Sequence, residues 1–501
     1  MNLILNDNLS KQYISLTALS VVVFILSFLA QLIVSKNFGT STELDAYWVA
    51  FSVVNLTTFY FSPFREALLS SFHKHNKSEI LLQGYVLFII LALVSSLILV
   101  LLELSSFYST LGSIAHIDTI IKLMPWFILY TFTFGFSEIF ACLLISLNEN
   151  YFQIRIKIIS YSCALIFLVL ATPRLGILSL VISPIIGHIF SIFFFWNKMK
   201  NIDYHYKFSP RLLYLTLQSS GFFSLFYPML FVLLVSQGCS VFEKAVMSHM
   251  KDGLVSSFQY SVSLVNVIVS IIAVPLSNLL WSPFIRSSNN KENKNKSILA
   301  CLKSIYLLFF GLLIITIFCF TYADDIIYLI FSRGEFNTYS FYLTSETFKI
   351  AIFAGIPVGL LNILFRYFLS ASDKRSLIST MFLIALMSFL ITLYSFYAGN
   401  QKLIQFNWLI SNSVGLCLGI FFLLSKLQFQ INTFIKKLIQ GFIFSSYIYL
   451  STSLVPTLHF GSGKIDVLFF LSLSFLMFSF ILSLPFFILY LIRMFKHENS
   501  H

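Results

Sequence analysis

Charged residues are scarce in this sequence, and their scarcity excludes a water-soluble fold. Only 10% of the 501 residues are Asp, Glu, Lys or Arg, whereas 58% are hydrophobic. Soluble domains carry roughly 25% charged residues. Apolar runs of about 20 residues, the length that crosses a bilayer, recur with short polar breaks between them. The sequence therefore predicts an all-α polytopic membrane protein.

Cysteine pairs and enzyme motifs are also lacking. The six cysteines share no CxxC spacing, so we expect small core residues. The segment 461–464 (GSGK) lacks the Ser/Thr and the upstream glycine of a phosphate-binding loop. Asp324-Asp325 resembles the metal-binding pair of a membrane glycosyltransferase or polymerase. Such an enzyme needs a sizeable extracytoplasmic domain for its acceptor, and the loop 322–345 is too short to form one. We expect a transporter, not an enzyme, with no cofactor and no metal.

Basic residues exceed acidic ones, giving a formal net charge of +12. In so apolar a chain this excess indicates loop anchors at the lipid surface, and membrane lipids rather than nucleic acid as partners. Most Lys and Arg residues fall in alternate loops, notably 198–210 and 285–297. Because basic residues are held on the cytoplasmic side, this bias predicts that these loops and both termini are cytoplasmic.

The apolar windows predict about fourteen transmembrane helices. Their approximate bounds are 12–36, 45–64, 81–102, 120–147, 152–172, 176–197, 210–236, 254–280, 298–321, 346–370, 376–398, 403–427, 431–455 and 465–492. An internal repeat groups them. Asn55 in the second span precedes a proline by 8 residues and a phenylalanine by 17, and Asn266 in the eighth does so by 9 and 18.

Helices two and eight are six spans apart, so the repeat predicts two like-oriented six-helix lobes. We expect an N-terminal lobe at 1–200, a C-terminal lobe at 201–430, and two extra helices with a cytoplasmic tail at 431–501. Parallel repeats of this kind enclose a central path at their interface. Asn55 and Asn266 either line that path or hydrogen-bond neighbouring helices.

Ionisable residues inside spans are the other site candidates, because burying a charge in a bilayer costs about 2.5–3.5 kcal/mol. Glu138 lies deep in its span with no cation one turn away, so we expect it to face a cavity or to be protonated. It has either a transport role or a structural hydrogen bond. Arg65 and Glu66 follow the second span and form either a gate pair near the cytoplasmic mouth or a snorkelling surface pair. Asp45 complements the dipole at the start of its own helix.

Several segments together resemble the MviN/MurJ family of lipid II flippases. The segments are 38–41 (FGTS) with 45–51 (DAYWVAF), 331–336 (FSRGEF) with 366–375 (RYFLSASDKR), and Leu147-Asn148 after Pro125. The resemblance covers about 15–427. It implies the fold of the multidrug/oligosaccharidyl-lipid/polysaccharide exporter superfamily, with two six-helix lobes in a V and two added helices. It also implies flipping of an undecaprenyl-linked saccharide by alternating access, with glycosyltransferases or a polymerase of the same pathway as partners.

The sequence departs from this family where a charged substrate would bind. Lipid II flippases carry cavity arginines on helices one, two and eight, but 12–36, 45–64 and 254–280 contain no arginine. Some relatives use acids on helices seven and eleven for a cation site, and 210–236 and 376–398 contain none. The cations left to meet a phosphate near the inner mouth are Lys36, Arg65, Lys122 and Arg286.

Three functions follow as alternatives. The leading one is a flippase for a polyprenyl-linked saccharide of capsule, exopolysaccharide or O-antigen type, with a lipid II precursor as the variant. The second is a cation-coupled small-molecule antiporter of the same superfamily, with Glu138 as its proton-binding group. The third is a non-transporting scaffold of a polysaccharide assembly complex.

Overall fold

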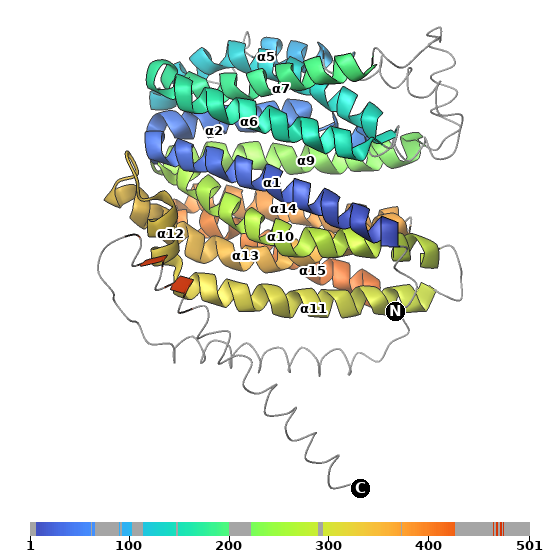
Figure 1. The fold of residues 1–501 in the computed structure, drawn as a ribbon. Helices are drawn as coiled ribbons and strands as arrows, with labels where there is room; N and C mark the ends of the chain where they lie inside the picture. Colours follow the sequence, from blue (N-terminus) through green and yellow to red (C-terminus); the bar gives the residue numbers. More distant parts are fainter. Residues whose placement is uncertain are drawn as a thin grey trace.

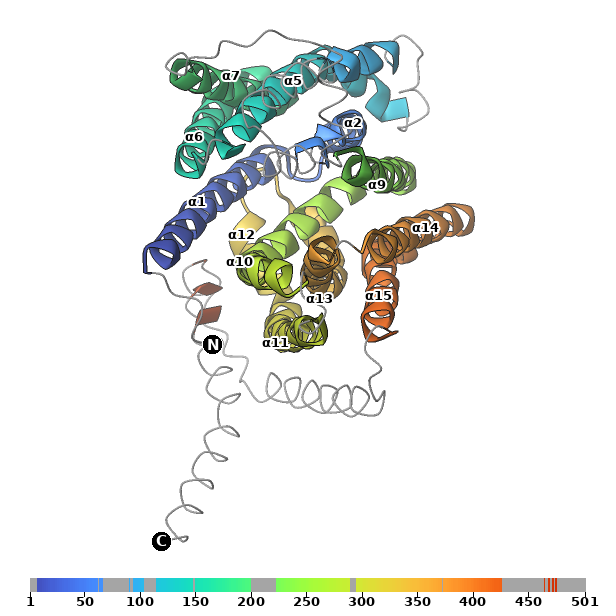
Figure 2. The same cartoon turned by 90° about the vertical axis from the view of Figure 1, so that its right-hand side faces the viewer.

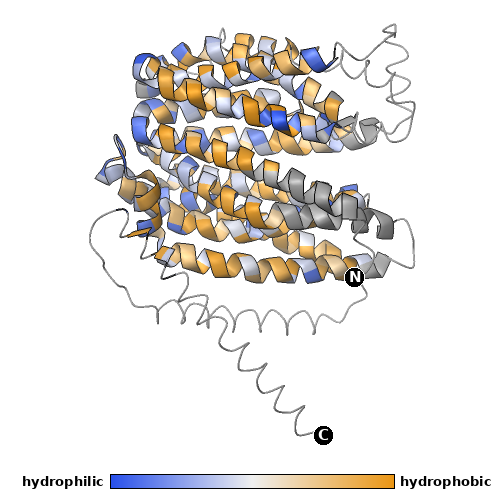
Figure 3. Cartoon of the chain, in the orientation of Figure 1, coloured by the Kyte–Doolittle hydropathy of each residue, from blue (hydrophilic) through white to orange (hydrophobic). Residues whose placement is uncertain are grey.

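A computed structural model describes most of the chain between residues 7 and 425. The described residues are 7–61, 63–65, 90, 93–102, 114–146, 149–199, 222–288, 294–371 and 373–425, with 464, 467–468, 471–472 and 474. Eight stretches among them are long and apolar enough to cross a membrane, and one of these, 151–198, contains two helices. Figure 3 shows mainly hydrophobic residues along the coloured parts of the helices, and many hydrophilic ones at the turns on the left. The chain is a polytopic helical membrane protein.

The helices lie in two groups that meet along α1, α2, α9 and α10 (Figures 1 and 2). The first group holds α1 (Asp7–Phe38), α2 (Thr42–Thr58), α5 (Ile114–Ser146), α6 (Asn150–Leu175), the short 3-10 turn Gly176–Leu178 and α7 (Ser179–Met199). The second holds α9 (Phe222–Met250), α10 (Leu254–Ser288), α11 (Lys294–Thr321), α12 (Ala323–Phe331), α13 (Thr338–Ser370), α14 (Lys374–Ala398) and α15 (Gln401–Ser425).

Most predicted spans that fall on described residues coincide with a helix. The span predicted at 210–236 ends too early, because α9 (Phe222–Met250) continues to Met250, while 210–221 lie outside the described residues. Polar residues around Gln237 and the adjacent charges of Glu243 and Lys244 are typical of a loop, but α9 continues through them. Only 90 and 93–102 of the span 81–102 are described as helical. The span 431–455, most of 465–492, and the lobe boundaries at 200 and 430 lie outside the described residues, so these predictions and the count of fourteen stay predictions.

Local sequence sets the helix ends. The hydroxyl of Ser41 accepts a hydrogen bond from the Leu44 amide at the start of α2, and Asn337 caps α13 through the Ser340 amide at 2.9 Å. Such caps satisfy amides that have no partner within the helix. Gly399 ends α14 with φ +61°, a left-handed conformation that glycine adopts without strain.

Small residues let helices of the second group approach closely, as is common in membrane bundles. A Cβ added at Gly355 of α13 would lie 3.0 Å from Val265 of α10, and one at Gly359 would lie 2.5 Å from Leu312 of α11. Phe348, Ile363 and Phe368 on α13 belong to the continuous apolar core. This packing makes α10, α11 and α13 a closely packed unit within the second group.

The short helix α12, which lies outside the spanning stretches, is held to α13 by polar contacts. Asp324 accepts hydrogen bonds from Ser345 and, at 2.8 Å, from Lys349. Partial burial raises the pKa of Asp324, but these hydrogen bonds and the charge of Lys349 outweigh it and leave the pKa below its ordinary value. The pair that the sequence could have offered as a metal site is therefore partly used in an ion pair.

Candidate functional site

The two groups are clamped together where α1 ends and α2 begins. Asp45 of α2 is fully buried and reaches the first turn of α10. One carboxylate oxygen accepts a hydrogen bond from the Gly253 amide at 2.7 Å, and the other accepts from the Ser256 amide at 2.8 Å and from the Ser256 hydroxyl. A carboxylate at a helix N-terminus satisfies free amides and complements the dipole. Asp45 therefore caps the helix of the opposite group, which corrects the expectation that it serves only its own helix.

Further contacts surround this carboxylate. The Tyr260 hydroxyl donates to the Gly39 carbonyl at 2.8 Å, and Thr40 and Ser340 share a hydrogen bond between their hydroxyls at 2.8 Å. The Glu335 amide donates to the Lys36 carbonyl at 2.9 Å. We call these contacts, together with those of Asp45, the clamp. The clamp and the short helix α12 lie at the left of Figure 1.

Glycines with positive φ make the clamp possible. Gly39 has φ +53°, and a Cβ there would lie 2.4 Å from the Glu335 carbonyl oxygen. Gly334 has φ +59°, and a Cβ there would lie 2.2 Å from the Lys36 carbonyl oxygen. Neither distance admits an atom, so only glycine permits the backbones to meet. The segments 38–41 and 331–336, far apart in sequence, are thus brought into direct contact.

A cavity of about 340 Å³ lies farther along α2, away from the clamp. Its lining comes from both groups: Asn55, Thr58, Phe59, Phe61, Arg65, Phe134, Glu138, Leu233 and Gln237. The Arg65 guanidinium donates to the Glu138 carboxylate at 3.0 Å, and the two side chains are 26% and 17% exposed. Glu138 therefore faces a cavity, as one expectation held, and its cation comes from the segment 63–65 that follows α2 rather than from its own helix.

The other predicted site residues are more scattered. Glu66 lies outside the described residues, so the predicted Arg65–Glu66 pair stays a prediction. Asn266 is exposed and does not line this cavity, which separates it from Asn55. Lys36 is exposed in the last turn of α1 at the clamp, and Lys122 is exposed on the first half of α5. Lys36 lies at the clamp, and Lys122 precedes Glu138, the partner of Arg65, by more than four helical turns on α5. Neither joins Arg65 in one cluster of cations, contrary to expectation.

Arg286 is in the last turn of α10, whose first turn is at the clamp. It therefore belongs to the end of the molecule away from the clamp, the end toward which Arg65 also lies. The side chain of Arg286 lies outside the described part of the structure. Of the four candidate cations, only Arg65 is described with its side chain in the cavity.

A buried polar node lies within the second group. The Asn407 amide nitrogen lies 2.7 Å from the Glu243 carboxylate, and 3.0 and 3.1 Å from the hydroxyls of Ser388 and Thr392. Three helices, α9, α14 and α15, supply these groups. The carboxylate and the two hydroxyls are the kinds of oxygen group that a proton or a hard monovalent cation binds, although the Asn407 nitrogen donates to all three in this structure. The premise that helix seven carries no acid is corrected, because α9 extends past Glu243.

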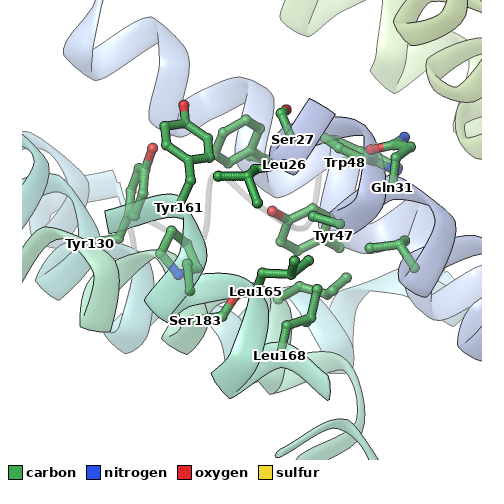
Figure 4. A pocket seen from close by; sticks show the side chains of 16 residues that line it. Leu26, Ser27, Gln31, Tyr47, Trp48, Tyr130, Tyr161, Leu165, Leu168 and Ser183 are labelled. Carbon is green, nitrogen blue, oxygen red and sulfur yellow. The ribbon is translucent and has the colours of Figure 1, made fainter. Parts of the chain in front are cut away.

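A second cavity, of about 260 Å³, lies inside the first group between α1, α2, α5, α6 and α7 (Figure 4). Gln31 and Trp48 lie at one side and Tyr130 and Tyr161 at the other. The Gln31 amide nitrogen and the Trp48 indole nitrogen are enclosed without a hydrogen-bond partner among the described residues. Its lining carries no charged side chain. The cavity suits an uncharged group with hydrogen-bond acceptors better than a phosphate.

The sequence from residue 34 to 486 matches the model of one protein family, described as lipid II flippase MurJ. The chain belongs to that family. It is accordingly a transporter rather than an enzyme. The family covers both groups of helices, the clamp and the α2–α5–α9 cavity.

Individual relatives belong to the same family. A probable lipid II flippase MurJ of Buchnera aphidicola subsp. Schizaphis graminum is 23% identical, with 91% of this chain and 92% of the relative covered. One from Buchnera aphidicola subsp. Baizongia pistaciae is 26% identical, with 74% of each covered. A solved lipid II flippase MurJ in an inward closed conformation has a TM-score of 0.73 and 20% identity, over 95% of this chain and 99% of that one.

More distant solved structures share the fold. A multidrug resistance MATE family transporter of the MOP superfamily, in an inward-facing conformation, has a TM-score of 0.63 and 12% identity, with 81% of this chain and 96% of that one covered. At this identity the likeness shows the fold alone. The predicted all-α polytopic fold of this kind of transporter is thereby confirmed, while the two added helices and the count of fourteen stay predictions.

Proposed function

We propose that the chain moves a polyprenyl-linked saccharide of the lipid II class across the cytoplasmic membrane by alternating access. The observation that carries this proposal is the clamp, which closes one end of the path with polar contacts that can separate. Asp45, Thr40 and Tyr260 make hydrogen bonds across the boundary between the groups, beside an apolar core that holds residues of both groups. Hydrogen bonds of this kind can be exchanged for bonds to water when the two groups part, at a net cost of about 0.5–1.5 kcal/mol each.

The basic loops support an orientation for this path. The loops 198–210 and 285–297 adjoin the ends of α7 and α10 that lie away from the clamp. If these loops are cytoplasmic, then the clamp is outside and the α2–α5–α9 cavity is at the inner mouth. The headgroup would enter beside Arg65 and Glu138 and leave after the clamp opens, while the polyprenyl tail stays in lipid between the groups.

Lipid II is the favoured member of this substrate class because the relatives that align over most of the chain are named as its flippases. Reconstitution tests this choice. Proteoliposomes that contain the protein should transfer a polyprenyl diphosphate-linked muropeptide between leaflets. Faster movement of a capsule or O-antigen precursor, with no transfer of the muropeptide, would shift the proposal to a dedicated polysaccharide. No transfer of any of these lipids would contradict a flippase and favour the scaffold.

The polar node at Glu243 favours one alternative, cation coupling. A buried carboxylate that exchanges a proton or sodium ion could drive either saccharide flipping or the export of a small molecule. A cation-coupled antiporter predicts changed drug tolerance with normal lipid-linked saccharides in cells that lack the protein. A flippase predicts that the lipid-linked saccharides accumulate on the inner leaflet.

A further inference from the structure

Lys244 is a cation within the bundle that no role described above requires. It lies on α9, six residues before the helix ends at Met250, and its side chain is only partly accessible. A lysine inside a spanning helix costs about 2.5–3.5 kcal/mol on insertion scales and usually marks a site. The predicted seventh span ends at 236 and therefore leaves Lys244 outside the membrane, whereas α9 includes it.

The neighbours of Lys244 leave its charge available. Its ammonium nitrogen lies 6.0 Å from the centre of the Trp48 ring on α2, across the boundary between the two groups. In the part of the chain that the structure describes, it has no carboxylate within 4 Å. Glu243, the next residue, contacts Asn407 within the second group. A cation–π contact of this kind is worth only about 0.5–2 kcal/mol, so a stronger partner can replace it.

The position of Lys244 continues the cavity described above. Gln237, which lines the α2–α5–α9 cavity, precedes Lys244 by two helical turns and so shares its face of α9. Trp48 precedes Asn55, another lining residue, by the same interval on α2. The two helices lie side by side (Figures 1 and 2). A single seam therefore runs from Asn55 and Gln237 to Trp48 and Lys244, about 10 Å nearer the clamp.

We propose that Lys244 is an anion-binding group of this seam, where it binds a phosphate or diphosphate after the two groups of helices part. The proposal rests on the proposed function for its physiological ligand, but not for the site itself. Arg65 begins hydrogen-bonded to Glu138. Lys244, by contrast, begins with a ring contact and an electrostatic interaction with Glu243, whose carboxylate is hydrogen-bonded to Asn407 instead. A phosphate that moves along the seam exchanges this ring contact for a charge-assisted hydrogen bond, which is stronger. The predicted spans 12–36, 45–64 and 254–280 contain no arginine. Lys244 thereby supplies a cation at the seam that these spans lack.

Inorganic diphosphate is the probe that tests this site. We would measure its dissociation constant for the full-length protein in lipid nanodiscs by calorimetry, at constant ionic strength. Lys244→Gln should weaken binding about tenfold or more, the usual loss for one charged hydrogen bond. Lys244→Arg should restore most of it. Lys402→Gln, at an exposed lysine of α15, is the matched control and should bind as the unchanged protein does.

Two results would overturn the proposal: diphosphate binding that is unchanged in Lys244→Gln, or no measurable binding to the unchanged protein. Lys244→Met serves if the glutamine variant does not fold. Failure of both neutral variants to fold, while Lys244→Arg folds, would assign the lysine to structure instead. Because binding is measured without transport, a protein that binds diphosphate through Lys244 but moves no lipid-linked saccharide would contradict the proposed function and leave the anion site standing.

Discussion

Asp45 on α2 accepts hydrogen bonds from both the amide and the hydroxyl of Ser256, which lies in the first turn of α10 in the other group of helices. A single buried carboxylate therefore joins the two groups. Because it binds the start of a helix, its charge is stabilised without a basic side chain. This contact gives the closed end of the path a specific, reversible bond.

Asp45→Asn should weaken this bond. The amide keeps one acceptor oxygen but sets an NH2 group against an N–H donor, and a charged hydrogen bond contributes about 1.5–3 kcal/mol. Hydrogen exchange at the Gly253 and Ser256 amides should speed up at least tenfold. Asp118→Asn, at an exposed acid of α5, is the control. Unchanged exchange at both amides in Asp45→Asn would show that the clamp does not depend on the carboxylate.

Two glycines with the same φ separate backbone strain from close approach. Gly39 and Gly176 both have φ +53°, but a Cβ at Gly176 has no atom within 4 Å, whereas one at Gly39 meets the Glu335 carbonyl. Alanine is strained at both positions, at a cost of about 1–3 kcal/mol, because side chains rarely adopt a positive φ. Only Gly39→Ala should also hold the two groups apart and stop export in reconstituted vesicles. Equal export by the two variants would mean that the clamp need not close this tightly.

The Arg65–Glu138 pair makes a prediction about export. Arg65→Ala should reduce export and leave Glu138 without its cation, while Arg65→Lys should restore part of it, because the two-pronged guanidinium geometry is lost. Glu138→Gln in the Arg65→Ala background should recover thermal stability, by about 1–3 kcal/mol for a pair between the exposed and buried limits, without recovering export. Normal export by Arg65→Ala would leave the pair a structural contact.

Glu243 tests cation coupling. Glu243→Gln keeps the hydrogen-bonded node with Asn407 but removes the negative charge. If the node binds a proton or sodium ion, then transport by this variant should no longer respond to the gradient of that ion. Glu149→Gln, at an exposed acid paired with Lys198, is the control. A variant that responds to the gradient as strongly as the control would exclude the node from coupling.

Much of the fold could be predicted because helix length and hydropathy are local properties. The predicted span 298–321 differs from α11 by four residues at its start, and 376–398 differs from α14 by two. Both ends at 321 and 398 coincide, since polar residues or a glycine mark them. The end of the seventh span was predicted wrongly because Glu243 and Lys244 interrupt the apolar pattern of α9. The contacts that accommodate these charges, with Asn407 and Trp48, come from other helices and cannot be predicted from the local sequence.

The site was less accessible from sequence because it depends on contacts between distant segments. Glu138 stood out as a lone acid in a span, but its partner, Arg65, lies 73 residues away. Asp45 fitted its own helix so well that no pattern pointed to Ser256, 211 residues later. Asn55 and Asn266 share a sequence repeat, yet only Asn55 lines the cavity, because a matching position in the sequence does not guarantee a matching surface.

A disulfide across the clamp tests most directly the claim that the two groups must separate there. The hydroxyl oxygens of Thr40 and Ser340 lie 2.8 Å apart, so Thr40→Cys with Ser340→Cys should form a disulfide under mild oxidation. In proteoliposomes the oxidised double variant should move no lipid-linked saccharide, and reduction should restore movement to the level of the two single variants. Equal movement in the oxidised and reduced states, with the disulfide confirmed by mass spectrometry, would contradict the account.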